Sequence, residues 1–391
     1  MELFDANVEK ANVLVWNAFL IRLVAVGGKD AAVAAKALEI HRKAKEKGVV
    51  LETAAYHVLI HLHGNAQRWQ EMEAILAEMK QQKGMLSQPT QMTYSVMIAH
   101  YLAGKKEKEA DECFETLLKS FKVDICAPFN SMIHYYGVEN PDKFNKGILV
   151  YERMKNIQVK PDAMTYISMS ACMGLQGDYS KMLKFLTLVK DGGYKIEEAY
   201  SSVLRDLAWY GSLDQATYLF NSMRENNNID PRLPDYCSMM IAARRALRDD
   251  VLRFMFEDCK NDQVGVKKPT LPMYRLMMGQ AVRAQKPFDL VRYFLETQRR
   301  RFKPDPYIYN AAWRVHLFRN DWRRFRNFFH TIRKSGVEPS FALAQEGLEV
   351  LSKLPGAELR EVRQYIEEVK ALRGGVVEEP IDFPLVPAEY E

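Results

Sequence analysis

The chain has 391 residues and a formal net charge of +5, and 48% of its residues are hydrophobic against 27% charged, a balance typical of a folded domain. No apolar run approaches the roughly 20 residues that cross a bilayer, so no membrane partner is expected. The five cysteines are widely spaced and form no CxxC pair. This pattern predicts neither a disulfide framework nor a metal or other cofactor.

The start of the chain does not resemble a targeting segment. The first ten residues hold three acidic side chains and no arginine, whereas a transit peptide is basic and amphipathic. We interpret residues 1–12 as a lead-in to the folded part of the chain.

From about residue 13 the sequence repeats itself. A proline stands five residues before a tyrosine at Pro89/Tyr94, Pro161/Tyr166, Pro231/Tyr236, Pro269/Tyr274 and Pro304/Tyr309. Equivalent positions along the chain, from Trp16 to Ala344, are 34 to 40 residues apart, and a period of this length is the signature of a solenoid. We therefore predict an all-α, right-handed superhelical solenoid of about ten helix-turn-helix repeats over residues 13–373. The repeats are expected to start near residues 13, 53, 91, 126, 163, 197, 233, 271, 306 and 341.

One repeat illustrates the pattern within each hairpin. Tyr94, Met97 and Tyr101 recur at helical spacing, and a second periodic stretch with Ala110 and Phe114 follows the break at residues 104–105. Second helices are expected to end at glycines with positive φ, namely Gly48, Gly84, Gly192 and Gly336. A loop is expected at residues 137–141, and residues 374–391, acidic and with three prolines, are expected to form an extended tail.

Charge is uneven along the chain. Residues 271–334 hold 15 Lys and Arg against 4 Asp and Glu, whereas residues 335–391 hold 5 against 12. Arginines alternate with aromatics in the basic region, which suits phosphate contact and base stacking. For a typical helical protein the aromatics would be core residues and the arginines a solvated face. If the partner is RNA, the candidate RNA-binding residues there are Arg299, Arg300, Arg301, Lys303, Arg319, Arg323, Arg324, Arg326 and Arg333.

Catalytic signatures are absent from the sequence. It has no phosphate-binding glycine loop, GxSxG or HExxH motif, so we predict neither enzymatic activity nor a small-molecule substrate. His57 and His61 lie one helical turn apart, but no Cys, Asp or Glu at ligand spacing joins them. We interpret these histidines as packing residues between repeats.

The repeats resemble those of the pentatricopeptide repeat family. The resemblance is clearest in NIQVKPDAMTYISM (156–169) and RRFKPDPYIYNAAW (300–313), and weaker in SGVEPSFALAQEG (335–347). It implies binding of single-stranded RNA along the first helices, with one nucleotide per repeat. In that family, the residue after the first-helix aromatic and the last residue of the repeat together select a base.

Two pairs in this chain match the family's pattern for base selection. The resemblance implies uracil at Asn130 with Asp162, and cytosine at Asn310 with Ser340. The remaining pairs do not form a regular code. They are Asn17/Glu52, His57/Thr90, Ser95/Ile125, Ile167/Ile196, Ser201/Arg232, Cys237/Thr270 and Arg275/Asp305.

A degenerate code and a local basic region favour a non-catalytic, RNA-associated scaffold. The resemblance implies a mitochondrial location, and among family roles we favour a subunit of the mitochondrial ribosome with rRNA and other ribonucleoprotein subunits as partners. A sequence-specific organellar RNA maturation, stability or translation factor is the first alternative. The second alternative is a protein–protein adaptor without RNA.

Overall fold

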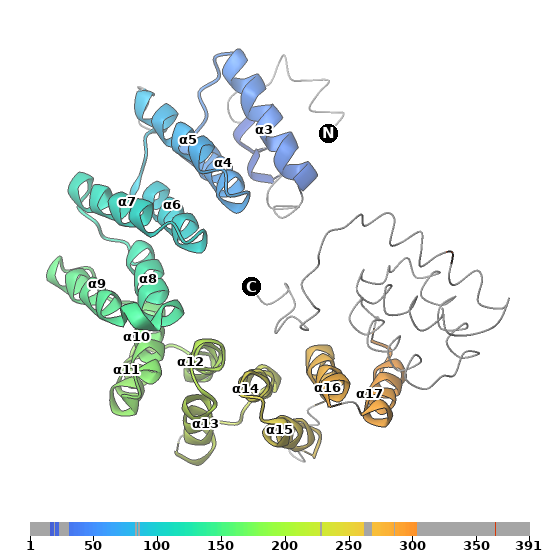
Figure 1. Cartoon of the computed structure of the whole chain (residues 1–391). Coiled ribbons are helices and arrows are strands. Elements are labelled where there is room, and N and C mark those ends of the chain that lie inside the picture. Colours follow the sequence, from blue (N-terminus) through green and yellow to red (C-terminus); the bar gives the residue numbers. More distant parts are fainter. Residues whose placement is uncertain are drawn as a thin grey trace. The chain divides into compact units, whose positions relative to one another are not determined.

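The computed structural model describes residues 16–18, 20–22, 31–82, 84, 87–226, 229–261, 268–284, 286–302 and 364. The chain divides into two compact units, unit 1 (Met1–Ile196) and unit 2 (Glu197–Glu391). The described residues form helices and connecting turns with no β-strand (Figure 1). They confirm the predicted all-α repeat solenoid. The lead-in, the tail and the repeats expected from residues 306 and 341 lie outside the described residues.

Each repeat contributes a first and a second helix. In unit 1 the first helices are α4 (Thr53–Asn65), α6 (Gln91–Ala103), α8 (Ala127–His134) and α10 (Ala163–Leu175), and the second helices are α3 (Ala31–Glu46), α5 (Trp69–Gln81), α7 (Glu107–Ser120), α9 (Phe144–Asn156) and α11 (Tyr179–Asp191). In unit 2 the first helices are α12 (Ile196–Tyr210), α14 (Leu233–Arg245) and α16 (Leu271–Arg283). The second helices of unit 2 are α13 (Leu213–Asn221), α15 (Asp249–Asn261) and α17 (Pro287–Arg299).

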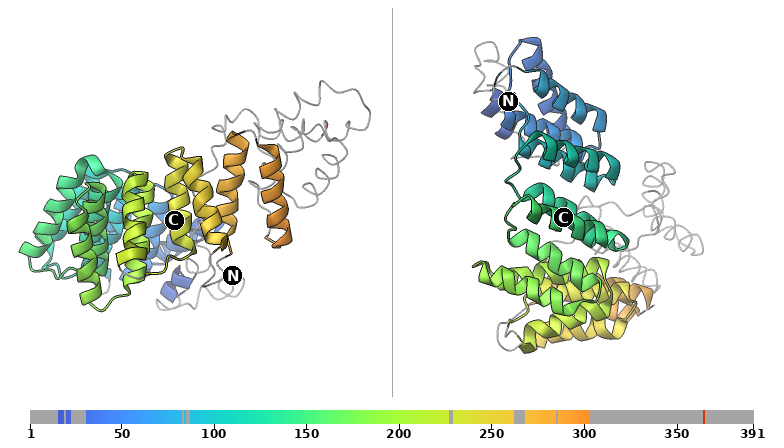
Figure 2. Two further views of the ribbon diagram at one scale, coloured as in Figure 1. Left: turned by 90° about the horizontal axis from the view of Figure 1, so that it is seen from below. Right: turned by 90° about the vertical axis from the view of Figure 1, so that its left-hand side faces the viewer.

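Successive first helices pack side by side in each unit, as the two further views in Figure 2 also show. In unit 1, α4 contacts α6, α6 contacts α8 and α8 contacts α10, and in unit 2 α14 contacts α16. The second helices form a separate layer behind them. None of the helices in the described residues is long and apolar enough to cross a membrane.

Side-chain caps fix where several helices begin. Asp162 accepts a hydrogen bond from the backbone N of Thr165 at 2.8 Å, and the Thr165 hydroxyl accepts one from the backbone N of Asp162 at 3.1 Å. This reciprocal capping box satisfies backbone donors that the first turn of a helix leaves unpaired. Equivalent boxes start α6, at Thr90 and Thr93, and α13, at Ser212 and Gln215.

The aromatic anchors fill the seams between helices. Tyr56, Phe129 and Tyr274 are at most 1% exposed, and the Phe129 ring lies edge-on to Phe114 with ring centroids 5.1 Å apart. Tyr166, by contrast, is only half-buried. Because no repeat can bury its apolar face alone, these contacts hold the stack together.

The anchor tyrosine also makes a polar contact that joins consecutive repeats. The Tyr274 hydroxyl donates to Glu296 Oε2 at 2.9 Å, and Lys260 Nζ of the preceding second helix lies 3.4 Å from the same oxygen. We call this arrangement the tyrosine–carboxylate–cation contact. It recurs as Tyr56/Glu78/Lys45 and Tyr236/Asp258/Arg224, with the carboxylate always 22 residues after the tyrosine.

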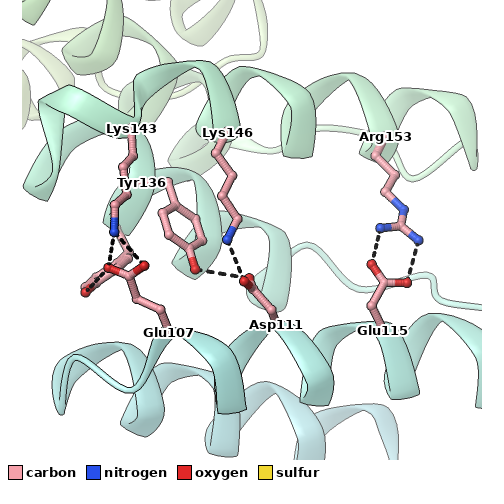
Figure 3. Close-up of polar contacts among 8 residues, drawn as sticks. Glu107, Asp111, Glu115, Tyr136, Lys143, Lys146 and Arg153 are labelled. Carbon is pink, nitrogen blue, oxygen red and sulfur yellow. Dashed lines mark hydrogen bonds and ion pairs between the residues drawn. The ribbon is translucent and has the colours of Figure 1, made fainter.

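A row of ion pairs joins the third and fourth repeats (Figure 3). Acidic residues one turn apart on α7 face basic residues of the next repeat. The pairs are Glu107 with Lys143, Asp111 with Lys146 and Glu115 with Arg153. Asp111 also accepts a hydrogen bond from the hydroxyl of Tyr136 at 3.0 Å, and the side chain of Tyr136 is fully buried.

We expect Asp111→Ala to lower the free energy of unfolding by about 2 kcal/mol, because the buried Tyr136 hydroxyl and Lys146 lose their partner. Glu112→Ala, at the exposed neighbouring position, is the matched control. Urea unfolding of both variants measures the difference. Adding Tyr136→Phe should restore much of the loss, and equal stability of the two single variants would contradict the assignment.

The prediction of a loop at residues 137–141 is wrong. A π-helix, Tyr135–Glu139, continues α8, and a 3₁₀-helix, Pro141–Lys143, precedes α9. Gly137 allows close packing against α10, because a Cβ built on it would lie 3.0 Å from Cys172 Sγ. A Cβ built on Gly147 would lie 2.9 Å from the backbone of Gly137. A glycine near a proline predicts a turn, but here the backbones of two helices meet.

Candidate nucleic-acid interface

The predicted base-facing pair Asn130 and Asp162 lies at the seam between α8 and α10. Asn130 Nδ2 donates to the two carboxylate oxygens of Asp162 at 3.0 and 3.3 Å. The Thr165 hydroxyl donates to Asn130 Oδ1 at 2.7 Å. The structure thus brings the pair together, and it also joins both side chains through a third residue.

Other predicted pairs also meet at seams between repeats, through different atoms. Asn17 Oδ1 accepts from the backbone N of Glu52 at 3.1 Å, not from its side chain. Ser201 Oγ accepts from Arg232 Nη2 at 2.9 Å. His57 Nε2 contacts Thr93 Oγ1 at 2.8 Å, three residues beyond the expected Thr90.

The sequence did not indicate a role at the site for the third residue of the following first helix. Thr93 and Thr165 each belong to a capping box and also contact the base-facing residue of the preceding repeat. The signal that could have found them is a threonine three residues after an N-cap. These contacts occupy hydrogen-bonding atoms that a base would otherwise use.

Three candidate basic residues fall within the described residues, and they differ in environment. Arg299 and Arg301 are exposed at the end of α17, and Arg301 has a φ of 57°. Arg300 is half-buried, donates to the Pro269 carbonyl at 3.3 Å and lies 5.4 Å from the Tyr274 ring centroid. Lys303, Arg319, Arg323, Arg324, Arg326 and Arg333, and the pair Asn310 and Ser340, lie outside the described residues.

Two histidines meet between α4 and α6. His100 Nε2 lies 2.7 Å from His61 Nδ1, and the His100 ring packs where a side chain on Gly64 would stand. Burial lowers the pKa of His100 to about 4, and the positive charge of a protonated His61 adds to the effect. No group of three His, Cys, Asp or Glu suited to a metal ion occurs among the described residues.

We expect acid to weaken the fold through His100. Its folded pKa lies below the unfolded value of about 6.5, so its contribution is complete above that pH and is lost as the pH falls toward 4. The expected loss between pH 7.5 and 4.5 is about 2 kcal/mol. Urea unfolding of His100→Gln should show a correspondingly smaller pH dependence. Parallel curves for the two proteins would contradict this.

The helices α4, α6, α8 and α10 differ in charge from the first helices of unit 2, although the helical residues before α3 include the exposed Arg22. α4, α6, α8 and α10 contain no Asp, Glu, Lys or Arg. The first helices of unit 2 carry the arginines Arg205, Arg244, Arg245, Arg275 and Arg283. Arg245 donates to the Ala208 carbonyl at 2.7 Å, and Arg283 pairs with Asp249 at 3.0 Å.

Comparison with known proteins agrees with the repeat geometry. Residues 27–192 match a family model described as the pentacotripeptide-repeat region of PRORP. This part of the chain, in which every described repeat has a first and a second helix, is thus similar to the pentatricopeptide repeat proteins. No curated protein sequence matches it.

Two solved structures are similar in outline. The pentatricopeptide repeat protein PPR10 in complex with an 18-nt psaJ RNA element has a TM-score of 0.42 and 16% identity, over 95% of this chain and 57% of that one. PPR10 from maize has a TM-score of 0.37 and 15% identity, over 97% and 66%. The chain thus spans less than two thirds of either structure's length.

Proposed function

We propose that the protein is a non-catalytic, RNA-associated scaffold, and that it is a subunit of the mitochondrial ribosome that docks on rRNA and neighbouring proteins. The match of residues 27–192 to a pentatricopeptide-repeat model supports RNA as a partner, because such repeats typically bind RNA. The mitochondrial and ribosomal parts of the proposal rest on the family resemblance.

The observation that carries the scaffold role is the internal use of the base-facing atoms. Ser201 is held by Arg232, Asn17 by the backbone of Glu52, and His57 by Thr93. A strand reader needs such side chains available to the Watson–Crick edge of each base. A chain that uses them to join its repeats is better suited to phosphate contacts with a folded RNA.

The Asn130–Asp162 pair favours the first alternative, a sequence-specific organellar RNA factor. This pair fits the family pattern, and both side chains are half-buried, so part of each is accessible. One such repeat cannot select a site among many competing sequences, because each base contributes only about 1–3 kcal/mol of discrimination.

Purification of the native complex tests the proposal. The tagged full chain, released gently from its source cells, should sediment with a ribosomal subunit, and sequencing of the bound RNA should return rRNA. A variant with Asn130→Ala and Asp162→Ala should bring down the same RNA. One enriched short motif that this variant loses would establish the sequence-specific factor instead, and absence of any RNA would establish the adaptor.

A further inference from the structure

Thr165 connects the start of α10 to the base-facing pair of the preceding repeat. Its hydroxyl oxygen accepts a hydrogen bond from the backbone N of Asp162 at 3.1 Å, and the same hydroxyl donates to Asn130 Oδ1 at 2.7 Å. We call the contacts among Asn130, Asp162 and Thr165 the amide clamp. The side chain of Thr165 is fully buried, so a ligand cannot touch it. An effect of Thr165 on a ligand must pass through Asn130 or Asp162.

The amide clamp fixes which way round the Asn130 amide lies. A carboxylate accepts hydrogen bonds and does not donate them, so the amide atom that faces Asp162, at 3.0 and 3.3 Å, is Nδ2. The opposite atom, Oδ1, faces the Thr165 hydroxyl. That hydroxyl lies nearer to Asn130 Oδ1, at 2.7 Å, than to Asp162 Oδ1, at 2.9 Å. The carboxylate thus sets the orientation of the amide, and the threonine keeps the amide from swinging away.

The amide clamp leaves part of Asn130 for a ligand. A primary amide has two N–H donors and two acceptor lone pairs, and the clamp uses one of each. Asn130 is half-buried, and its remaining N–H and lone pair stand side by side in a fixed order.

That order matters for a nucleobase. Uracil presents the O4 acceptor beside an N3–H donor, whereas cytosine presents the N4–H donor beside the N3 acceptor. An amide that can turn over serves both bases equally, but a clamped amide serves one order better than the other. The amide clamp therefore distinguishes two pyrimidines of the same size.

A threonine at this place is uncommon in the chain. Thr165 and Thr93 stand immediately before the anchor aromatic of α10 and α6, and Thr93 contacts His57 Nε2 of the preceding repeat at 2.8 Å. In the other first helices from α4 to α16 the residue before the anchor is Ala55, Pro128, Ala199, Asp235 or Met273. Among these helices, Thr165 alone combines the hydroxyl with a side-chain amide of the preceding repeat.

We propose that Thr165 is a positioning residue for an unpaired nucleobase bound at Asn130, and that it fixes the order in which the amide presents its donor and acceptor. The proposal rests on the RNA-associated function and concerns the base that meets this seam. It requires one nucleotide at Asn130 and no sequence-specific site elsewhere on the chain.

A comparison of two RNA homopolymers tests this proposal. The purified full chain is titrated with short oligo(U) and oligo(C) of equal length at one salt concentration, because affinity for RNA depends on salt. The readout is the ratio of the two dissociation constants. Thr165→Val keeps the shape of the side chain and loses the hydroxyl, so it should shift this ratio about threefold or more toward that of Asn130→Ala. Thr165→Ser, which keeps the hydroxyl, should retain the wild-type ratio.

A double-mutant cycle separates positioning from a loss of stability, since Thr165→Val also removes one contact of the α10 capping box. In an Asn130→Ala background, Thr165→Val should change the ratio no further, because the threonine acts only through the amide. An equal shift in both backgrounds would overturn the proposal. An unchanged ratio in Thr165→Val, or no binding of either oligonucleotide to the wild-type chain, would also overturn it.

A second measurement covers a Thr165→Val variant that does not fold, which thermal melting would show. The wild-type chain is labelled with isotopic asparagine, and Asn130→Ala identifies the side-chain amide signals of Asn130. Addition of the tighter-binding oligonucleotide should shift these signals, and signals that do not move would overturn the proposal.

The two proposals fail in different ways. Native complexes that contain no RNA would remove the RNA-associated function. A chain that brings down rRNA, but whose Thr165→Val variant keeps the wild-type ratio, would remove the proposal for Thr165 and leave the RNA-associated function standing.

Discussion

Phe256→Ala is expected to lower the free energy of unfolding by about 4 kcal/mol, because the substitution removes a large aromatic ring from the core. Phe256 is fully buried in α15. Its ring lies edge-on to Tyr274 and Tyr293, with centroids 5.2 and 5.6 Å apart. Truncation removes both ring contacts and leaves a cavity at the seam between repeats seven and eight.

Phe254 provides a matched control two residues away. It lies on the same helix but is 61% exposed, so Phe254→Ala should change the stability by less than about 0.5 kcal/mol. Urea unfolding followed by circular dichroism measures both variants. Similar midpoints for the two would show that the seam does not depend on the buried ring.

Gly147→Ala is expected to destabilise the protein by about 2 kcal/mol. Alanine normally stabilises a helix relative to glycine by about 1 kcal/mol. Here, however, the added Cβ would stand 2.9 Å from the Cα and N of Gly137. Both are backbone atoms, so relief requires α9 to move away from the π-helix.

Gly84→Ala is the control for this substitution. A Cβ at Gly84 would meet only Ser87 Oγ, at an ordinary 3.8 Å, so little change in the thermal midpoint is expected. If Gly147→Ala unfolds at or above the wild-type temperature, the close approach of the two glycines is not what holds this seam.

The repeat architecture could be predicted because its signals are local. A proline that interrupts one helix and an aromatic five residues later recur in phase, and that period indicates stacked hairpins. Helix ends were predicted less well. Gly48 has the expected positive φ of 66°, whereas Gly84 does not have a positive φ, and after α11 the positive φ falls on Gly193 and not on Gly192. Either glycine allows that conformation, and packing decides between them. Gly336 lies outside the described residues.

The contacts between repeats could not be predicted in the same way. Lys260 and Glu296 are 36 residues apart in the sequence, and each alone is typical of a solvated helix surface. Only the stacking of second helices brings them to the hydroxyl of Tyr274.

At the candidate site, the sequence placed Asn130 opposite Asp162 through the family resemblance. It could not show that Thr165 joins them. The charge count over residues 271–334 likewise did not reveal how charge is distributed between first and second helices. Charge summed along a segment does not distinguish first from second helices, and the absence of charge from α4 and α6 becomes apparent only when the helices are known.

The tyrosine–carboxylate–cation contact gives the repeats that carry it equivalent junctions. In each of the three contacts, one repeat supplies the tyrosine and the carboxylate, and the repeat before it supplies the cation, as Lys260 does for Glu296. Loss of residues 233–270 would place Arg224 before Glu296 instead of Asp258, with Tyr274 in the place of Tyr236. At such a junction, removal of one whole repeat would therefore leave the tyrosine, the carboxylate and the cation at the same spacing, with no further substitution needed there.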